Sequence, residues 1–390
     1  MVSTQILQRC SRPDSPPTLF TNAVNFTQQF RSFHPLLAAV PIASRHLSSR
    51  SGALDHRRAR QEISMRAAIH TQFGDPSKVL ELGDRPTPQP GKGQVRIAMR
   101  RSPIHNHDLW TVRGNYGYKP EVPAIGGSEG SGVIDALGEG VEGLQVGQRV
   151  VAAGVHESWA EYFLADATGV VPLPDALDDD RGCQLIAMPL SALMLIEFLQ
   201  VKKGDWIVQN TANGAVGKTV AMLAAARGIN VINLVRRDAG VDELKALGIG
   251  NAVSNAQDGW QDAVRALAGD APIVCAIDSV AGKAAGELMG LLAEGGELIS
   301  FGSMTGEPLE ISSGDVIFKQ ATVRGFWGSK VMQATKSEDK RRMIGELLKA
   351  ALDGSLALPV EAVFDLEDAA KAAAASAEPG RRGKILLRAG

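Results

Sequence analysis

The chain has 390 residues, of which 44% are hydrophobic and 22% charged, and its formal net charge at pH 7 is -2; this length suits two domains of ordinary size, and the composition excludes disordered or collagen-like chains. The longest apolar stretch, LIAMPLSALMLIEFL, is interrupted by Pro189, Ser191 and Glu197 and is shorter than the ~20 residues that cross a bilayer, so we expect no membrane span. Residues 65–390 carry 33 basic and 40 acidic residues, and this acidic balance excludes the basic stripe that nucleic-acid-binding proteins need.

Residues 1–64 differ in composition from the rest of the chain. They hold eight arginines, no lysine and three acidic residues, mixed with Ser and Pro. This composition fits a transit peptide, a disordered tail or an over-long start-site assignment, so we expect the folded protein to begin near Met65. The isolated cysteines, Cys10, Cys183 and Cys275, favour a reducing compartment. We expect a cytoplasmic location, or the mitochondrial matrix if residues 1–64 are a transit peptide.

Residues 65–390 contain two regions with different hydrophobic patterns. From Val95 to Val151, short alternating runs such as QVRIAM and GQRVVAA are separated by Gly and Pro, which predicts a small β-rich domain. From Asp205, strands such as DWIVQ, NVINLV, PIVCAIDSV and GELISFGS alternate with helical segments such as GVDELKALG. This alternation predicts an α/β fold with a doubly wound parallel sheet. After about Phe326 the chain is mainly helical and ends on the strand GKILLRAG.

The first strand of that alternation runs into a glycine-rich turn. Ala212-x-Gly214-x-x-Gly217 follows DWIVQ and opens a helix. Glycines there allow a tight turn and a close helix–strand contact, and the helix N-terminus can hold a pyrophosphate. The alternative is a tight turn without a ligand. The context of strand, turn and helix favours dinucleotide binding.

The second strand ends in LVRRD, with Arg236, Arg237 and Asp238. An NAD enzyme places an acidic residue there for the ribose 2′-hydroxyl, whereas a guanidinium suits a 2′-phosphate. We therefore expect NADPH as the cofactor, although the arginines could also be a solvated surface pair and Asp238 could face a ribose.

The layout resembles that of zinc alcohol dehydrogenases, but the metal ligands are missing. The three neighbourhoods that supply them in those enzymes are PIHNHDLW, GGSEG and IAMPLS here, offering His105, His107, Ser128 and Met188. Catalytic zinc needs three converging Cys, His or carboxylate ligands. We expect no metal, and we interpret the two histidines as polar residues of a loop or cleft.

The motifs GNYGYKPEVPAIGGSEG, QNTANGAVG, NVINLVRRD, FGSM and GFWGS follow one another along residues 65–390. In this order they closely resemble the mitochondrial-type 2-enoyl thioester reductases, a zinc-free branch of the medium-chain dehydrogenase/reductase superfamily. The resemblance implies a GroES-like catalytic domain over residues 65–186, a Rossmann NADPH-binding domain over 187–325, and a return to the catalytic domain over 326–390.

The resemblance also implies a reaction and a site. Members of the family reduce trans-2-enoyl thioesters of CoA or acyl carrier protein with NADPH, in fatty-acid metabolism, and the tyrosine of GNYG, here Tyr116, acts as the acid. Tyr116 could instead be a packing residue. The implied cofactor-binding residues are Asn213, Gly214, Ala215, Val216, Gly217, Arg236, Arg237, Asp238, Phe301, Gly302, Ser303, Met304, Phe326, Trp327, Gly328 and Lys384. Trp327 could equally be a core or interface aromatic.

One position departs from the family. The family has an Asn before the Pro that opens the cofactor domain, and this chain has Met188 before Pro189. Strict acyl-thioester specificity is therefore in question, and a quinone or small-enone reductase is the rival enzyme. A non-catalytic NADPH-binding protein is the rival from another class. We also expect a homodimer and a small-molecule substrate, with acyl carrier protein as a possible partner.

Overall fold

The computed structural model describes residues 64–390. The expectations for residues 1–64, and with them the choice between a cytoplasmic and a mitochondrial location, fall almost wholly outside the described residues and stay predictions. No helix in the described part of the chain is long and apolar enough to cross a membrane.

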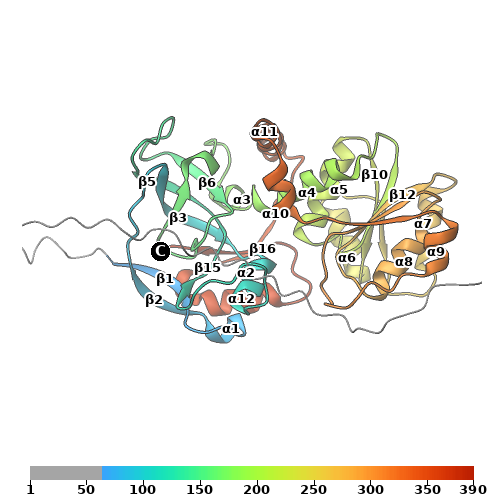
Figure 1. Ribbon diagram of the computed structural model, residues 1–390, viewed down its shortest axis with the longest axis horizontal. Helices are drawn as coiled ribbons and strands as arrows, with labels where there is room; N and C mark the ends of the chain where they lie inside the picture. Colours follow the sequence, from blue (N-terminus) through green and yellow to red (C-terminus); the bar gives the residue numbers. More distant parts are fainter. Residues whose placement is uncertain (1–63) are drawn as a thin grey trace, which may run out of the picture. The chain divides into compact units, whose positions relative to one another are not determined.

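The first part of the described chain is built of short strands (Figure 1). Strands β1, β2 and β4 form a three-stranded sheet in the order β2-β1-β4, and β3, β5, β6, β7 and β8 belong to a second, seven-stranded sheet. Alternating burial along β3 places Val95, Ile97 and Met99 in the core, as expected of a strand with one buried face. The strands are β1 (Ser64–His70), β2 (Glu81–Pro86), β3 (Gln94–Pro103), β4 (Ala124–Ile125), β5 (Glu129–Leu137), β6 (Arg149–Ala153), β7 (Tyr162–Asp166) and β8 (Val170–Pro172). The helices among them are α1 (Pro76–Val79), α2 (Asn106–Val112), η1 (Ala167–Gly169) and α3 (Asp179–Gly182).

The middle of the chain forms a six-stranded parallel sheet. Its order is β11-β10-β9-β12-β13-β14, with every neighbouring pair parallel. The chain therefore starts in the middle at β9, winds outward to one edge and returns to β12, which is the Rossmann order with a switch point between β9 and β12. The strands are β9 (Trp206–Gln209), β10 (Asn230–Val235), β11 (Ala252–Ser254), β12 (Ile273–Asp278), β13 (Glu297–Ser300) and β14 (Thr322–Gly325). The helices that precede or join them are α4 (Ala187–Leu199), α5 (Ala215–Ala226), α6 (Asp238–Ala246), α7 (Trp260–Ala268), α8 (Lys283–Leu291) and α9 (Ser313–Phe318).

Both faces of this sheet are buried. Ile207 packs into a core shared with α4 and α5, whereas its neighbour Val208 packs into the core on the other face, beneath α7 and α8. A strand buried on both faces carries apolar residues on both sides, which explains the four apolar residues of NVINLV. The buried Asn233 is satisfied by the Gln209 side chain, whose Nε2 donates to Asn233 Oδ1 at 2.7 Å.

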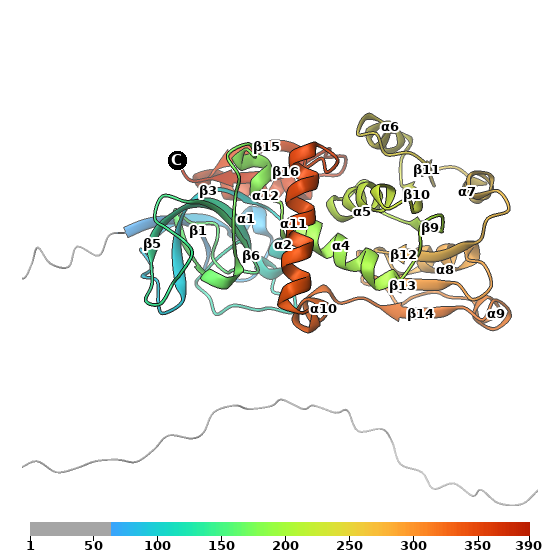
Figure 2. The same cartoon turned by 90° about the horizontal axis from the view of Figure 1, so that it is seen from above.

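The last part of the chain returns to the first sheet. β16 pairs with β3 in antiparallel fashion and with β15 in parallel fashion, while α11 packs beside α4 (Figure 2). These elements are α10 (Gly328–Ala334), α11 (Ser337–Asp353), β15 (Val360–Asp365), η2 (Leu366–Asp368), α12 (Ala369–Ala377) and β16 (Lys384–Arg388). The residue boundaries proposed for the domains stay predictions.

Candidate active site

A cleft of about 2150 Å³ joins the β-rich part of the chain to the carboxyl ends of β9, β10, β12 and β13. Its wall holds every site residue expected from the sequence except Arg237 and Asp238. Those lining residues are Tyr116, Asn213, Gly214, Ala215, Val216, Gly217, Arg236, Phe301, Gly302, Ser303, Met304, Phe326, Trp327, Gly328 and Lys384. Met188 lines the same cleft. A cleft at the switch point of a doubly wound sheet is where such folds bind their ligands.

The glycine turn is shaped for a dinucleotide. Helix α5 begins at Ala215, and no side chain caps its N-terminus at Gly214, so its first amide groups point into the cleft with the positive end of the helix dipole. A Cβ on Gly217 would lie 2.7 Å from the Ala212 Cα and 2.7 Å from the Thr211 oxygen. Only glycine permits this approach of the helix to the turn that follows β9, and the arrangement fits the pyrophosphate of a dinucleotide.

The pair of arginines lies at the end of β10, as expected. Arg236, Arg237 and Asp238 are all exposed, and Asp238 begins α6. The Arg237 guanidinium lies against Gly380, where a Cβ would be 3.0 Å from Nη2. The chain between α12 and β16 therefore passes beside the arginines at this end of the site.

Sequence reasoning missed Lys218, which follows Gly217 on α5 and lines the cleft. The side chain is buried and its Nζ donates to the Arg382 carbonyl oxygen at 2.7 Å, while Glu243 of α6 forms an ion pair with it. The position of Lys218 in the first turn of the predicted helix could have indicated that it lines the site. Its partners Arg382 and Glu243 could not be predicted, because they come from distant segments.

Tyr116 lies on the loop that follows α2. Its side chain is 43% exposed and its ring stacks on that of His107, with centroids 5.6 Å apart and planes inclined by 29°. Burial, and then the charge of Asp108, raise the pKa of Tyr116 above its ordinary value, so the phenol carries its proton at neutral pH. Tyr118 stacks instead on His156, at 4.2 Å.

Beside Tyr116, three polar side chains form a hydrogen-bonded series that we call the Asp108–Ser128–His107 chain. The Ser128 hydroxyl donates to Asp108 Oδ1 at 2.6 Å, and His107 Nε2 lies 2.7 Å from Ser128 Oγ. Asp108 Oδ2 also accepts the backbone N–H of His105 at 2.9 Å. Ser128 is held in place because Gly127, with φ of 93°, turns the chain against Trp159.

A second polar series lies beneath the first. His105 and Glu129 side chains are fully buried, with Nε2 and Oε2 2.8 Å apart. Lys384 Nζ donates to His105 Nδ1 at 2.9 Å and to the Ile104 carbonyl oxygen at 3.2 Å. Burial lowers the pKa of His105 and of Lys384, and raises that of Glu129. Of the two histidines expected in a loop or cleft, His107 lines the cleft, whereas His105 is buried.

Glu129 also fixes the start of the cofactor part of the chain. Its Oε1 accepts the backbone N–H groups of Ile186 and Ala187 at 2.9 and 2.8 Å. The buried series therefore ties β5, the N-terminus of α2, β16 and the first turn of α4 together. The cofactor role expected for Lys384 stays a prediction, because its ammonium is directed to His105 and Ile104.

Three residues at the positions expected to hold zinc in alcohol dehydrogenases, His105, His107 and Ser128, form the hydrogen bonds described above instead. Within residues 64–390, no three His, Cys, Asp or Glu side chains gather so as to hold a metal ion. Cys183 and Cys275 are both buried. The absence of a functional metal stays a prediction.

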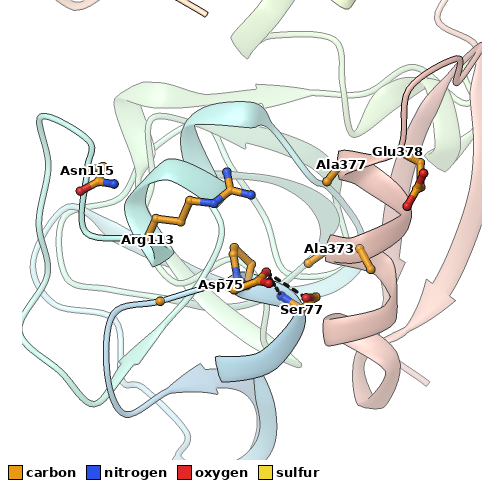
Figure 3. A pocket seen from close by; sticks show the side chains of 10 residues that line it. Asp75, Ser77, Arg113, Asn115, Ala373, Ala377 and Glu378 are labelled. Atoms are coloured by element: carbon orange, nitrogen blue, oxygen red, sulfur yellow. Dashed lines mark hydrogen bonds between the residues drawn. The ribbon is translucent and has the colours of Figure 1, made fainter. Parts of the chain in front are cut away.

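A smaller pocket of about 600 Å³ lies between the start of α1, the chain that follows α2, and α12 (Figure 3). Arg113 and Asn115 line it together with Asp75, Ser77 and Glu378. Asp75 is occupied as the cap of α1, accepting both the Ser77 backbone N–H at 3.1 Å and its hydroxyl at 2.8 Å. Arg113, Ala377 and Glu378 line both pockets, but no residue of the glycine turn lines the smaller one, so we place the candidate active site in the larger cleft.

Two family models match the chain. The alcohol dehydrogenase GroES-like domain matches residues 91–175, and the zinc-binding dehydrogenase model matches residues 215–348. A solved mycobacterial quinone oxidoreductase is 25% identical, with a TM-score of 0.74 over 83% of this chain and 99% of that one. A second solved structure, of a mycobacterial protein complexed with NADPH, is also 25% identical, with a TM-score of 0.74 over 83% of this chain and 99% of that one. Fold and site together define an NAD(P)-binding oxidoreductase of the medium-chain dehydrogenase/reductase superfamily, and the predicted fold class is confirmed.

Comparison with curated relatives identifies the family within this superfamily. The human protein named mitochondrial enoyl-[acyl-carrier-protein] reductase is 31% identical over 330 residues, which cover 83% of this chain and 88% of that protein. The Arabidopsis thaliana protein of the same name is 33% identical over 305 residues, covering 76% and 81%. The chain belongs to the mitochondrial-type enoyl thioester reductase family, which confirms the resemblance seen in its motifs.

Proposed function

We propose that this protein is an NADPH-dependent reductase of the activated C=C bond of trans-2-enoyl thioesters, carried on CoA or acyl carrier protein, in fatty-acid metabolism. The observation that carries the proposal is the position of Tyr116. A half-buried phenol lies in the same cleft as the glycine turn, in a chain whose curated relatives are named enoyl-[acyl-carrier-protein] reductases.

The proposed reaction divides the work between the two parts of the chain. When held at the glycine turn, the dinucleotide would supply the hydride for the β-carbon of the substrate. Negative charge then develops on the thioester as an enolate, and the Tyr116 hydroxyl transfers its proton to the α-carbon. Met188 and Trp327 line the same cleft and help to position the substrate.

Cofactor selection is assigned to Arg236 and Arg237. Two exposed guanidinium groups at the end of β10 can form charge-assisted hydrogen bonds with a 2′-phosphate. The amide groups at the start of α5 would hold the pyrophosphate, and residues 301–304, which line the same cleft, would contact the nicotinamide half. NADPH is therefore the cofactor in this proposal.

A second candidate is an NADPH-dependent quinone or small-enone reductase. It is favoured by the solved relative titled a quinone oxidoreductase and by Met188, which leaves an apolar side chain in the cleft. The same hydride chemistry serves both candidates, so the electron acceptor separates them. A protein that only binds NADPH is the third possibility.

One kinetic screen tests all three. Wild-type protein is assayed with NADPH against crotonyl-CoA, a long-chain enoyl thioester, a quinone and a small enone, and the enoyl thioesters should give the highest kcat/KM. Tyr116→Phe should lower kcat on an enoyl thioester by about 10²-fold, the scale of one acid or oxyanion donor. Tyr118→Phe should change kcat much less. Turnover of quinone alone, or of nothing, would contradict the proposal.

We also propose a homodimer. Strand β14 is an edge of the six-stranded sheet, and no other strand in residues 64–390 pairs with its outer side. Ile317 and Phe318, just before it, are 59% and 83% exposed, and Val323 on the strand is 41% exposed. An apolar, unpaired edge of this kind is suited to pairing with a second copy.

A further inference from the structure

The Asp108–Ser128–His107 chain has a fixed direction. Asp108 accepts hydrogen bonds from both Ser128 and the His105 backbone N–H. The single hydroxyl hydrogen of Ser128 is thus directed to Asp108, so Ser128 Oγ must accept from His107 Nε2 at 2.7 Å. His107 therefore carries a proton on Nε2, and Nδ1 receives no hydrogen bond from the described residues.

This direction keeps the hydrogen bond of His107 Nε2 in place whether the imidazole is neutral or positive. When Nδ1 also takes a proton, the resulting imidazolium keeps its bond to Ser128, and Asp108 Oδ1 lies 3.5 Å from Nε2. The hydrogen bonds from His107 to Ser128 and from Ser128 to Asp108 fix the orientation of the imidazole ring. His105, stacked on the other side at 5.0 Å, is committed to Glu129 and Lys384 and does not compete for Asp108 through its ring.

Tyr116 needs such a neighbour in the proposed reaction. Once its hydroxyl has given up a proton, a negative oxygen remains, and both burial and Asp108 disfavour that charge. The His107 ring is stacked on the Tyr116 ring. Of the groups in the Asp108–Ser128–His107 chain, only His107 can become positive.

We propose that His107 is a positioning residue for Tyr116: the imidazole, held by Ser128 and Asp108, orients the phenol ring and, as a cation, balances the charge left on the Tyr116 oxygen. The proton on that oxygen is then restored from solvent. This inference rests on the proposed function, because it requires Tyr116 to be the proton donor.

A double-mutant cycle tests it, with His107→Asn, Tyr116→Phe, the double variant and wild type assayed on the acceptor with the highest kcat/KM. His107→Asn should lower kcat by about tenfold or more while KM changes little. The double variant should have the same kcat as Tyr116→Phe, because His107 acts through that hydroxyl. Added imidazole should restore part of the kcat of His107→Ala but not that of Tyr116→Phe.

Two further variants guard against a folding defect. Ser128→Ala leaves both rings in place and cuts the link to Asp108, so it should lower kcat in the same direction. His156→Asn removes the ring stacked on Tyr118 and is the matched control, whose effect should multiply with that of Tyr116→Phe.

The kcat values of these variants distinguish a failure of the His107 role from a failure of the proposed function. If Tyr116→Phe is impaired while His107→Asn and Ser128→Ala keep the wild-type kcat, the inference is overturned and the proposed function stands. If the effects of His107→Asn and Tyr116→Phe multiply, His107 acts independently of Tyr116 and the inference is also overturned. If Tyr116→Phe keeps the wild-type kcat on enoyl thioesters, the inference and the acid role of Tyr116 fail while the reductase assignment stands; if enoyl thioesters are not turned over at all, the proposed function fails.

Discussion

Within the glycine turn, the closest packing is at Gly217, and we expect Gly217→Ala to lower both the stability of the fold and the affinity for NADPH. In Gly217→Ala the new Cβ meets the Ala212 Cα and the Thr211 oxygen at 2.7 Å, and the Ala212 oxygen at 2.8 Å. All three atoms belong to the backbone, so no side chain can turn aside. Ordinary van der Waals contact begins near 3.4 Å, and α5 must therefore move away from the turn at Thr211 and Ala212 by about 0.7 Å.

That displacement sets the expected magnitude. Inserting a methyl group into close packing costs about 1–3 kcal/mol of folding free energy. A shift of about 0.7 Å also lengthens a pyrophosphate hydrogen bond from ~2.9 to ~3.6 Å, outside the useful range. Losing one such bond to a charged group costs about 1.5–3 kcal/mol, so the Kd for NADPH should rise at least about tenfold.

Substitutions at two other glycines, Gly214 and Gly290, serve as controls for Gly217→Ala. Gly214→Ala meets one atom, the Thr211 oxygen, at 3.2 Å, and Gly290→Ala on α8 meets nothing within 4 Å. Urea unfolding and fluorescence titration with NADPH should rank Gly217→Ala as most impaired, Gly214→Ala next and Gly290→Ala equal to wild type or slightly stabilised. Wild-type NADPH affinity and urea midpoint in Gly217→Ala would refute the steric argument.

Three further outcomes are expected. Because Ser128 and Met188 stand where zinc ligands would be needed, purified protein should hold no stoichiometric zinc and keep its activity in chelator; about one zinc per chain, with activity lost on its removal, would contradict this. Replacing Arg236 and Arg237 together by Ala should lower the NADPH to NADH ratio of kcat/KM at least about tenfold, since each charge-assisted bond contributes ~1.5–3 kcal/mol, and an unchanged ratio would show that neither reads the 2′-phosphate. Phe318→Asp should convert a dimer to a monomer in sedimentation velocity because it places a charge on an 83% exposed apolar side chain, whereas an unaltered dimer would locate the interface elsewhere.

The elements buried on both faces were the ones that sequence predicted well. NVINLV corresponds to β10 over Asn230–Val235, because a central parallel strand is mainly apolar on both faces, as Val231, Ile232, Leu234 and Val235 are here. The edge strands were not identified. β11 has three residues and β14 is mostly exposed, with the sequence TVRG, so neither carries an apolar run or an alternation that would distinguish it from a loop.

The same contrast holds for the site. The glycine turn was predictable because its function depends on consecutive residues at the end of one strand. The series of His105, Glu129 and Lys384 joins residues 24 and 279 positions apart, and no local pattern links them. The sequence indicated His107 as a polar residue of a loop or cleft and Ser128 as the replacement of a zinc ligand, but it did not pair them. Their hydrogen bond at 2.7 Å depends on the fold that brings α2 to the start of β5.

Met188 connects that buried series to specificity. It is the second residue of α4, whose preceding amides are fixed by Glu129, so a side chain at this position projects from a rigid backbone into the cleft. Met188→Asn would place there the amide that the family carries, and one added neutral hydrogen bond contributes about 0.5–1.5 kcal/mol. We expect kcat/KM for crotonyl-CoA to rise by ~2-fold to ~10-fold relative to that for a quinone. Met188→Leu, which keeps an apolar side chain, is the control and should show no such rise; a gain in Met188→Leu equal to that in Met188→Asn would mean that cleft shape, rather than an amide donor, sets the preference for thioesters.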